Sequence, residues 1–111
     1  SGRILKTAKA VSEKLDATLV ALPTLFPLDS EEVLKYTKDA KLVVTIEDGT
    51  KTGGLGSLIA SVNSESNHPV PMLICAFPDV PIIHGTASEL DKYYNMDADS
   101  IIRRIEEKLN G

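Results

Sequence analysis

Residues 43–57 read VVTIEDGTKTGGLGS, and this stretch decides the fold. Its first half belongs to an almost continuously apolar, β-branched run (41–47, KLVVTIE), which is typical of a central strand covered on both faces. Three glycines, Gly53, Gly54 and Gly56, come next, and an apolar stripe at helical spacing then predicts a helix. Backbone N–H groups at such a helix start attract anions, so the turn is placed where phosphate loops are found.

The spacing of the glycines does not match a phosphate loop. A dinucleotide-binding fingerprint needs G-x-G-x-x-G/A, but the G-L-G at 54–56 is followed by Ile59 in the third position. A P-loop needs glycine directly before Lys-Ser/Thr, whereas Lys51 follows Thr50. We therefore favour a turn in which the glycines permit unusual backbone angles and close packing, with phosphate binding as the alternative.

Four polar or reactive side chains invite a functional interpretation. Glu47 and Asp48 end the predicted strand, and we expect one of them to cap or orient the glycine turn rather than act as a general acid or base. We interpret His84 as a hydrogen-bonded loop residue, with a proton shuttle as the alternative, and Cys75 as an inert thiol in a buried strand. The residues that could contact an anion or a neighbouring domain are Glu47, Gly53, Gly54, Gly56, Ser57 and His84.

Outside this stretch, helical and strand patterns alternate along the chain. This order predicts one α/β domain over residues 1–111, a three-layer domain with a mostly parallel central sheet and helices on both faces. We expect Tyr36, Tyr93, Tyr94 and Leu109 to contribute to the inner faces of their helices. The expected elements are a helix over 3–15, a β-rich run at 18–22, a helix from an Asp29 cap to Thr37, a helix from 55 to about 64, a strand over 70–77, an irregular connection or short edge strand over 78–85, a short helix capped by Thr86 and Glu89, and a last helix capped by Asp97.

Composition narrows the class of protein. A net charge of −4 and the absence of a basic patch interleaved with aromatics argue against a nucleic-acid partner. A single cysteine and no Cys/His group with zinc spacing indicate a reduced, cytoplasmic protein without a structural metal. No apolar run approaches the roughly 20 residues that span a bilayer, so no membrane partner is expected.

The order of several short motifs resembles the C-terminal domain of the transketolase family. These motifs are GRILKTA (2–8), FPLD (26–29), LVVTIED with GGLGS (42–57) and MDADSIIRRIEEKL (96–109). PDVPIIHG at 78–85 makes the chain look most like the 1-deoxy-D-xylulose-5-phosphate synthase branch of that family. Together the motifs cover nearly the whole chain, and their order is more specific than any single one.

The resemblance implies a structural and dimerisation role in a larger transferase. Such an enzyme would condense pyruvate with glyceraldehyde 3-phosphate, with loss of CO₂, toward isoprenoid and thiamine precursors. Thiamine diphosphate and Mg²⁺ would be held by the other domains, which together with the homodimer partner are the implied partners. In the family a strand precedes the glycine that Gly2 matches, so we expect this chain to lack its first strand, to be inactive alone and to self-associate. No catalytic, cofactor-binding or metal-ligating residue is assigned to it.

Two other functions stay open at this point. The same domain occurs in transketolases and in the β chains of 2-oxoacid dehydrogenases, so the resemblance also fits those parents. A stand-alone regulatory module that binds a small anion at 53–57 is the alternative from a different class.

Overall fold

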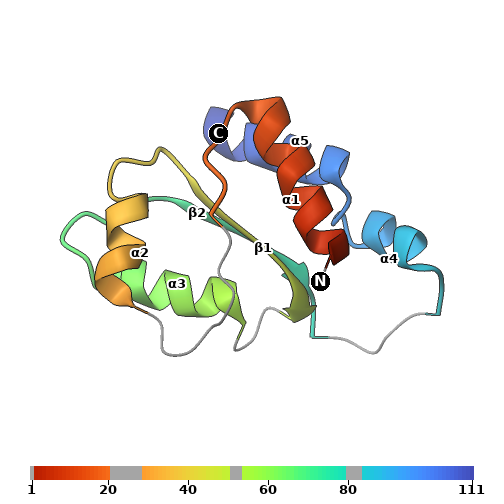
Figure 1. The fold of residues 1–111 in the computed structure, drawn as a ribbon, viewed down its shortest axis with the longest axis horizontal. Helices are drawn as coiled ribbons and strands as arrows, with labels where there is room; N and C mark the ends of the chain where they lie inside the picture. The colour runs from red at the N-terminus through yellow and green to blue at the C-terminus, as the bar shows by residue number, and fades with distance from the viewer. Residues whose placement is uncertain (1, 21–28, 51–53, 80–83) are drawn as a thin grey trace.

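A computed structural model describes residues 2–20, 29–50, 54–79 and 84–111. Helices and strands alternate through this part of the chain, as the sequence predicts (Figure 1). In order, the elements are α1 (Gly2–Leu15), α2 (Ser30–Thr37), β1 (Val43–Thr50), α3 (Leu55–Ser64), β2 (Met72–Phe77), α4 (Ala87–Tyr93) and α5 (Ala98–Asn110).

The two strands of the described sheet run parallel, with Val43 opposite Met72 and Ile46 opposite Cys75. Helices α1 and α5 cover one face of this sheet, and α2 and α3 lie on the other (Figure 1). Two parallel strands cannot be joined by a tight hairpin, so α3 forms the crossover between them. The three-layer α/β architecture expected from the sequence is confirmed.

The main core lies between the sheet and the α1–α5 layer. Cys75 on β2 and Ile101 on α5 are fully buried, as is Met96 in the loop before α5. Ile4 and Val11 of α1 complete this cluster because their helical spacing places them on one face. No helix in the described part of the chain is long and apolar enough to cross a membrane.

The predicted helix caps are present. Asp29 accepts hydrogen bonds from the N–H groups of Glu31 and Glu32, at 3.1 and 3.2 Å. Thr86 and Glu89 form a reciprocal capping box at the start of α4. Local hydrogen bonding alone fixes such caps, which is why sequence spacing predicts them well.

The expected strand at 18–22 is not formed in its described part. Residues 18–20 have no regular secondary structure, and Leu19 and Val20 are 40% and 41% exposed. Residues 21 and 22 lie outside the described residues. In the described sheet, β1 pairs with β2 alone, so the prediction that β1 is a central strand is wrong there. Residues 18–20 have strand-like composition, but the described part of the chain offers them no neighbouring strand with which to pair.

Three apolar side chains expected on inner faces are exposed instead: Tyr36 is 57% exposed, Tyr93 65% and Leu109 52%. Each lies at or near the C-terminal end of its helix, beyond the residues that the helix buries. Tyr94 does pack inward, edge-on against Phe77 with ring centroids 5.8 Å apart. Two other sequence features, residues 26–28 of the FPLD motif and 80–83 of the expected connection, fall outside the described residues.

Candidate functional site

The carboxylate of Glu47 closes the turn between β1 and α3. Its Oε1 accepts a hydrogen bond from the N–H of Leu55 at 2.8 Å, and its Oε2 accepts one from the N–H of Gly56 at 2.7 Å. Gly54 occupies the N-cap position and has no side chain with which to cap, and the first turn of α3 contains no acidic residue. Glu47 therefore supplies both the missing cap and the negative charge that the helix N-terminus favours.

Gly56 brings α3 close to the sheet. A Cβ atom at this position would lie 2.5 Å from Cγ2 of Ile74, 2.8 Å from Oγ1 of Thr45 and 3.0 Å from Oε2 of Glu47. Contacts under 3 Å require a shift of the neighbouring atoms, so only glycine fits without displacing them. Gly56 therefore provides the close packing of helix against strand. Ile59, which stands where a dinucleotide-binding fingerprint has its third glycine or alanine, is buried.

Side-chain alternation along β1 explains which residues reach the turn. Residues two apart in a strand point to the same face, so Thr45 and Glu47 both point toward α3. Val44 and Ile46 point to the other face, toward α1 and α5. Thr45 is 6% exposed, and its hydroxyl has no hydrogen-bond partner in the described part of the chain. The position of Thr45 beside Gly56 was not predicted. Strand alternation could have indicated it, because Thr45 is two positions from Glu47 and therefore lies on the same face of β1.

The structure brings together only some of the predicted site residues. Glu47, Gly54 and Gly56 form one cluster, and Ser57 follows in the first turn of α3, where its carbonyl accepts a bond from the Ser61 hydroxyl at 3.1 Å. Gly53 lies outside the described residues. His84 is exposed in the loop before α4, and no hydrogen bond joins it to Glu47. The interpretation of one carboxylate as the cap of the turn is confirmed for Glu47.

Cys75 is buried against the α1–α5 layer. Burial raises the pKa of its thiol, and the positive charge of Arg104 opposes this only in part. A thiol that resists ionisation is a poor nucleophile, which agrees with the prediction that Cys75 is inert. Among the described residues, no group of three or more His, Cys, Asp or Glu side chains could hold a metal ion.

One ion pair fixes the short helix α4 to the body of the domain. The guanidinium of Arg3 on α1 binds both carboxylate oxygens of Asp91, with Nε–Oδ2 3.0 Å and Nη2–Oδ1 3.1 Å. The side chain of Asp91 is 10% exposed and that of Arg3 is 45% exposed. The bidentate geometry makes this pair more specific than an ordinary surface ion pair. Sequence periodicity could not predict it, because the partners are 88 positions apart.

These features define a class of protein. The chain is a three-layer α/β domain in which a carboxylate of the protein itself occupies the helix N-terminus where a nucleotide-binding domain would hold phosphate. Residues 2–101 match the family described as "Transketolase, C-terminal domain", and the chain belongs to that family.

The curated relatives narrow the similarity from the family to one kind of enzyme. The chain is 35% identical over 104 residues to a 1-deoxy-D-xylulose-5-phosphate synthase of Buchnera aphidicola, covering 94% of this chain and 17% of the relative. It is 36% identical over 104 residues to the synthase of Mannheimia succiniciproducens, with the same coverage. With the synthase of Thioalkalivibrio sulfidiphilus it shares 35% identity over 109 residues, which are 98% of this chain and 17% of that protein. The chain therefore spans about a sixth of the length of the relatives that it matches.

Proposed function

We propose that this chain is the C-terminal domain of a 1-deoxy-D-xylulose-5-phosphate synthase, in which it packs against the other domains and against a homodimer partner. The observation that carries the proposal is the coverage of the match. Relatives of that name align with 94–98% of this chain but devote only 17% of their own length to it. Such coverage is expected when this chain corresponds to one whole domain of the relatives and their other domains lie outside the matched region.

The parent enzyme would be cytoplasmic and would join pyruvate to glyceraldehyde 3-phosphate with release of CO₂, toward isoprenoids and thiamine. Thiamine diphosphate with Mg²⁺ would supply the decarboxylation chemistry, and the residues described here do not fit that cofactor. The α3 N-terminus is the place best suited to a pyrophosphate, but the Glu47 carboxylate already accepts from two of its N–H groups. A second anion there would meet that negative charge at close range. The cofactor therefore belongs to other domains.

The proposed contribution of this chain is a rigid surface. Exposed apolar side chains lie on several elements, among them Leu5 on α1 at 41% exposure and Tyr93 on α4 at 65%. Tyr93 stands edge-on to Tyr94, with ring centroids 4.9 Å apart, so the ring of Tyr94 supports one side of the Tyr93 ring. Preordered aromatic side chains of this kind favour packing against neighbouring domains.

Expression of the complete gene product tests the proposal. We expect the full-length protein to release CO₂ when pyruvate and glyceraldehyde 3-phosphate are supplied together and to bind thiamine diphosphate in calorimetry. The 111-residue chain should do neither. A full-length protein that binds thiamine diphosphate but uses another pair of substrates would assign the domain to a transketolase or a 2-oxoacid dehydrogenase instead.

The small-anion module is the second candidate, and the same geometry argues against it. Glu47 competes for the N–H groups that an anion would need. We expect titration of the 111-residue chain with inorganic phosphate to leave the amide chemical shifts of residues 54–57 unchanged. A saturable shift of the Gly54 or Gly56 amide would favour the regulatory module over the scaffold.

A further inference from the structure

The sequence contains four asparagines, and one of them, Asn110, directly precedes a glycine. An asparagine side chain can react with its own main chain, because the backbone nitrogen of the next residue can attack the side-chain carbonyl carbon Cγ. Glycine has no Cβ, so its nitrogen meets the least steric hindrance and its backbone moves most freely. The Asn110–Gly111 pair therefore has the covalent arrangement that favours this attack most.

Helix α5 ends at this pair. Asn110 is the last residue of the helix, and the N–H of Gly111 donates to the Glu107 carbonyl at 2.9 Å. This is the last backbone hydrogen bond of α5. Helix ends open at a free-energy cost close to zero, and asparagine is a weaker helix former than alanine. The Gly111 nitrogen is therefore released from its hydrogen bond far more easily than a nitrogen inside the helix.

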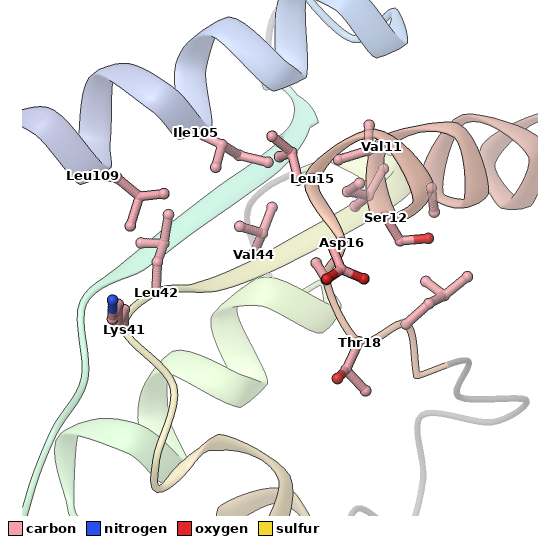
Figure 2. Close-up of a pocket in the computed structure, with 14 residues that line it drawn as sticks. Val11, Ser12, Leu15, Asp16, Thr18, Lys41, Leu42, Val44, Ile105 and Leu109 are labelled. Atoms are coloured by element: carbon pink, nitrogen blue, oxygen red, sulfur yellow. The ribbon is translucent and has the colours of Figure 1, made fainter.

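The side chain of Asn110 lies beyond the packed part of α5. Ile105 and Leu109 face a groove of about 430 Å³ that Leu42 and Val44 also line (Figure 2). Leu109 is already 52% exposed. Asn110 is exposed too, and its side-chain amide has no hydrogen-bond partner in the described part of the chain. It can therefore rotate toward the Gly111 nitrogen without breaking a contact.

Two of the other asparagines are held in place. Asn63 donates from Nδ2 to the Val70 carbonyl at 2.7 Å and accepts at Oδ1 from the Val70 N–H at 2.9 Å, which fixes its side chain. At Asn95, the attacking atom would be the nitrogen of Met96. That nitrogen donates to the Asp91 carbonyl at 2.6 Å, and Met96 is fully buried. Neither side chain can reach the geometry of attack without a larger opening of the fold.

Asn67 is the most informative comparison, because it is exposed like Asn110. The residue that follows it is His68, whose side chain crowds the attacking nitrogen, whereas Gly111 leaves that nitrogen open. Exposure and the following residue therefore favour Asn110 together, and no other asparagine of the chain combines the two.

We propose that Asn110 is a site of spontaneous, age-dependent deamidation. The Gly111 nitrogen forms a bond to Cγ of Asn110 and loses its proton, while the bond from Cγ to Nδ2 breaks and Nδ2 leaves as ammonia. One water molecule then opens the resulting succinimide ring at either carbonyl, which leaves aspartate or isoaspartate at position 110. The step needs no oxidant or reductant, and the inference is independent of the proposed function.

The product changes the end of α5. It places a negative charge at a helix C-terminus, where the backbone carbonyls already carry partial negative charge, and Glu106 and Glu107 stand in the same turn. Isoaspartate also inserts a methylene group into the main chain, which displaces Gly111 from the Glu107 carbonyl. We therefore expect the last turn of α5 to open more readily as the protein ages, while the buried contacts of Ile101 stay intact.

Peptide mass spectrometry of the full-length protein, incubated in mildly alkaline buffer, tests the proposal. Residue 110 should convert at least tenfold faster than Asn67, and Gly111→Ala should slow conversion at residue 110 at least tenfold. Gly49→Ala, a matched change far from α5 in the sequence, should leave the rate at residue 110 unchanged. Equal rates at residues 67 and 110, or a Gly111→Ala protein that reacts at the parental rate, would overturn the proposal.

The same incubation in urea tests the structural part of the argument. Folding should slow the reaction at Asn110 by less than about threefold, because the helix end opens at little cost. Folding should slow the reactions at Asn63 and Asn95 at least tenfold, because their surroundings must open first. If Asn110 reacts in urea but stays intact in the folded protein, α5 protects it and the proposal fails.

A pair of substitutions tests the effect of the product. Asn110→Asp should make the amides of the last turn of α5 exchange about threefold faster than Asn110→Gln does at low salt, because only aspartate adds the unfavourable charge. High salt should remove most of this difference. Equal exchange in the two variants at low salt would refute the expected opening by charge.

Discussion

Replacement of Gly56 by alanine tests the close approach of α3 to the sheet. The new Cβ would lie 2.5 Å from Cγ2 of Ile74 and 2.8 Å from Oγ1 of Thr45, so the helix must move outward. Overpacking of this kind costs about 1–3 kcal/mol. Movement of α3 also weakens the two hydrogen bonds to Glu47, a cap worth about 0.5–2 kcal/mol, whereas alanine regains about 1 kcal/mol of helix propensity. We therefore expect a net destabilisation of about 2 kcal/mol.

Urea unfolding followed by circular dichroism measures this change directly. With an unfolding entropy of about 2.1 cal/mol/K per residue, the same loss lowers the melting temperature of a chain of this length by about 9 °C. Gly49→Ala is the matched control, because a Cβ on Gly49 meets nothing within 4 Å. The control should be neutral or slightly stabilising. A Gly56→Ala protein as stable as the parent, or equal losses at the two positions, would refute the packing argument.

Three further predictions concern the turn and the last helix. Glu47→Gln should cost about 1 kcal/mol in urea unfolding, since an amide offers one acceptor oxygen for the two N–H groups of Leu55 and Gly56; Glu106→Gln on the exposed face of α5 should cost nothing measurable. Thr45→Val should stabilise the protein by about 1 kcal/mol by removing a buried hydroxyl without a partner in the described residues, and a loss of stability would reveal a bond to that hydroxyl. Partial burial acts to raise the pKa of Asp97, but hydrogen bonds from Ser100 and the charge of Arg103 outweigh it and lower this pKa below the ordinary 3.8. A lowered folded-state pKa means that the stability contributed by Asp97 is present above pH 3.8 and is lost as the pH falls through the folded value, so Asp97→Asn should flatten the acid limb of the stability curve.

Local features of the fold were predictable because they depend on short-range interactions. The caps at Asp29, Thr86 and Asp97 each bond to N–H groups within three positions, so their spacing is written in the sequence. The inner face of α5 follows from helical periodicity at Ile101 and Ile105. Exposure at helix ends was less predictable, since Tyr93 and Leu109 continue the apolar pattern beyond the surface that could cover them.

The candidate site was predictable in kind but not in geometry. The strand, the turn and the presence of a capping carboxylate followed from the order of residues 43–57. The choice of Glu47 depends on strand parity and on the position of α3, which together direct its carboxylate to the N–H groups of Leu55 and Gly56. Thr45 escaped notice because an ordinary strand-forming residue gives no local sign that its hydroxyl is buried without a partner.

The sequence by itself determined the α/β class, the helix caps and the failure of the glycine turn to match a phosphate loop, since each depends on residues close together in the chain. Only the tertiary structure decided that Gly56 is where α3 meets the sheet and that Arg3 pairs with Asp91. It alone also showed that residues 18–20 lie outside the described sheet, in which β1 pairs with β2 alone. These outcomes depend on contacts between distant segments, and a strand-forming sequence becomes a strand only when a neighbouring strand completes its hydrogen bonds.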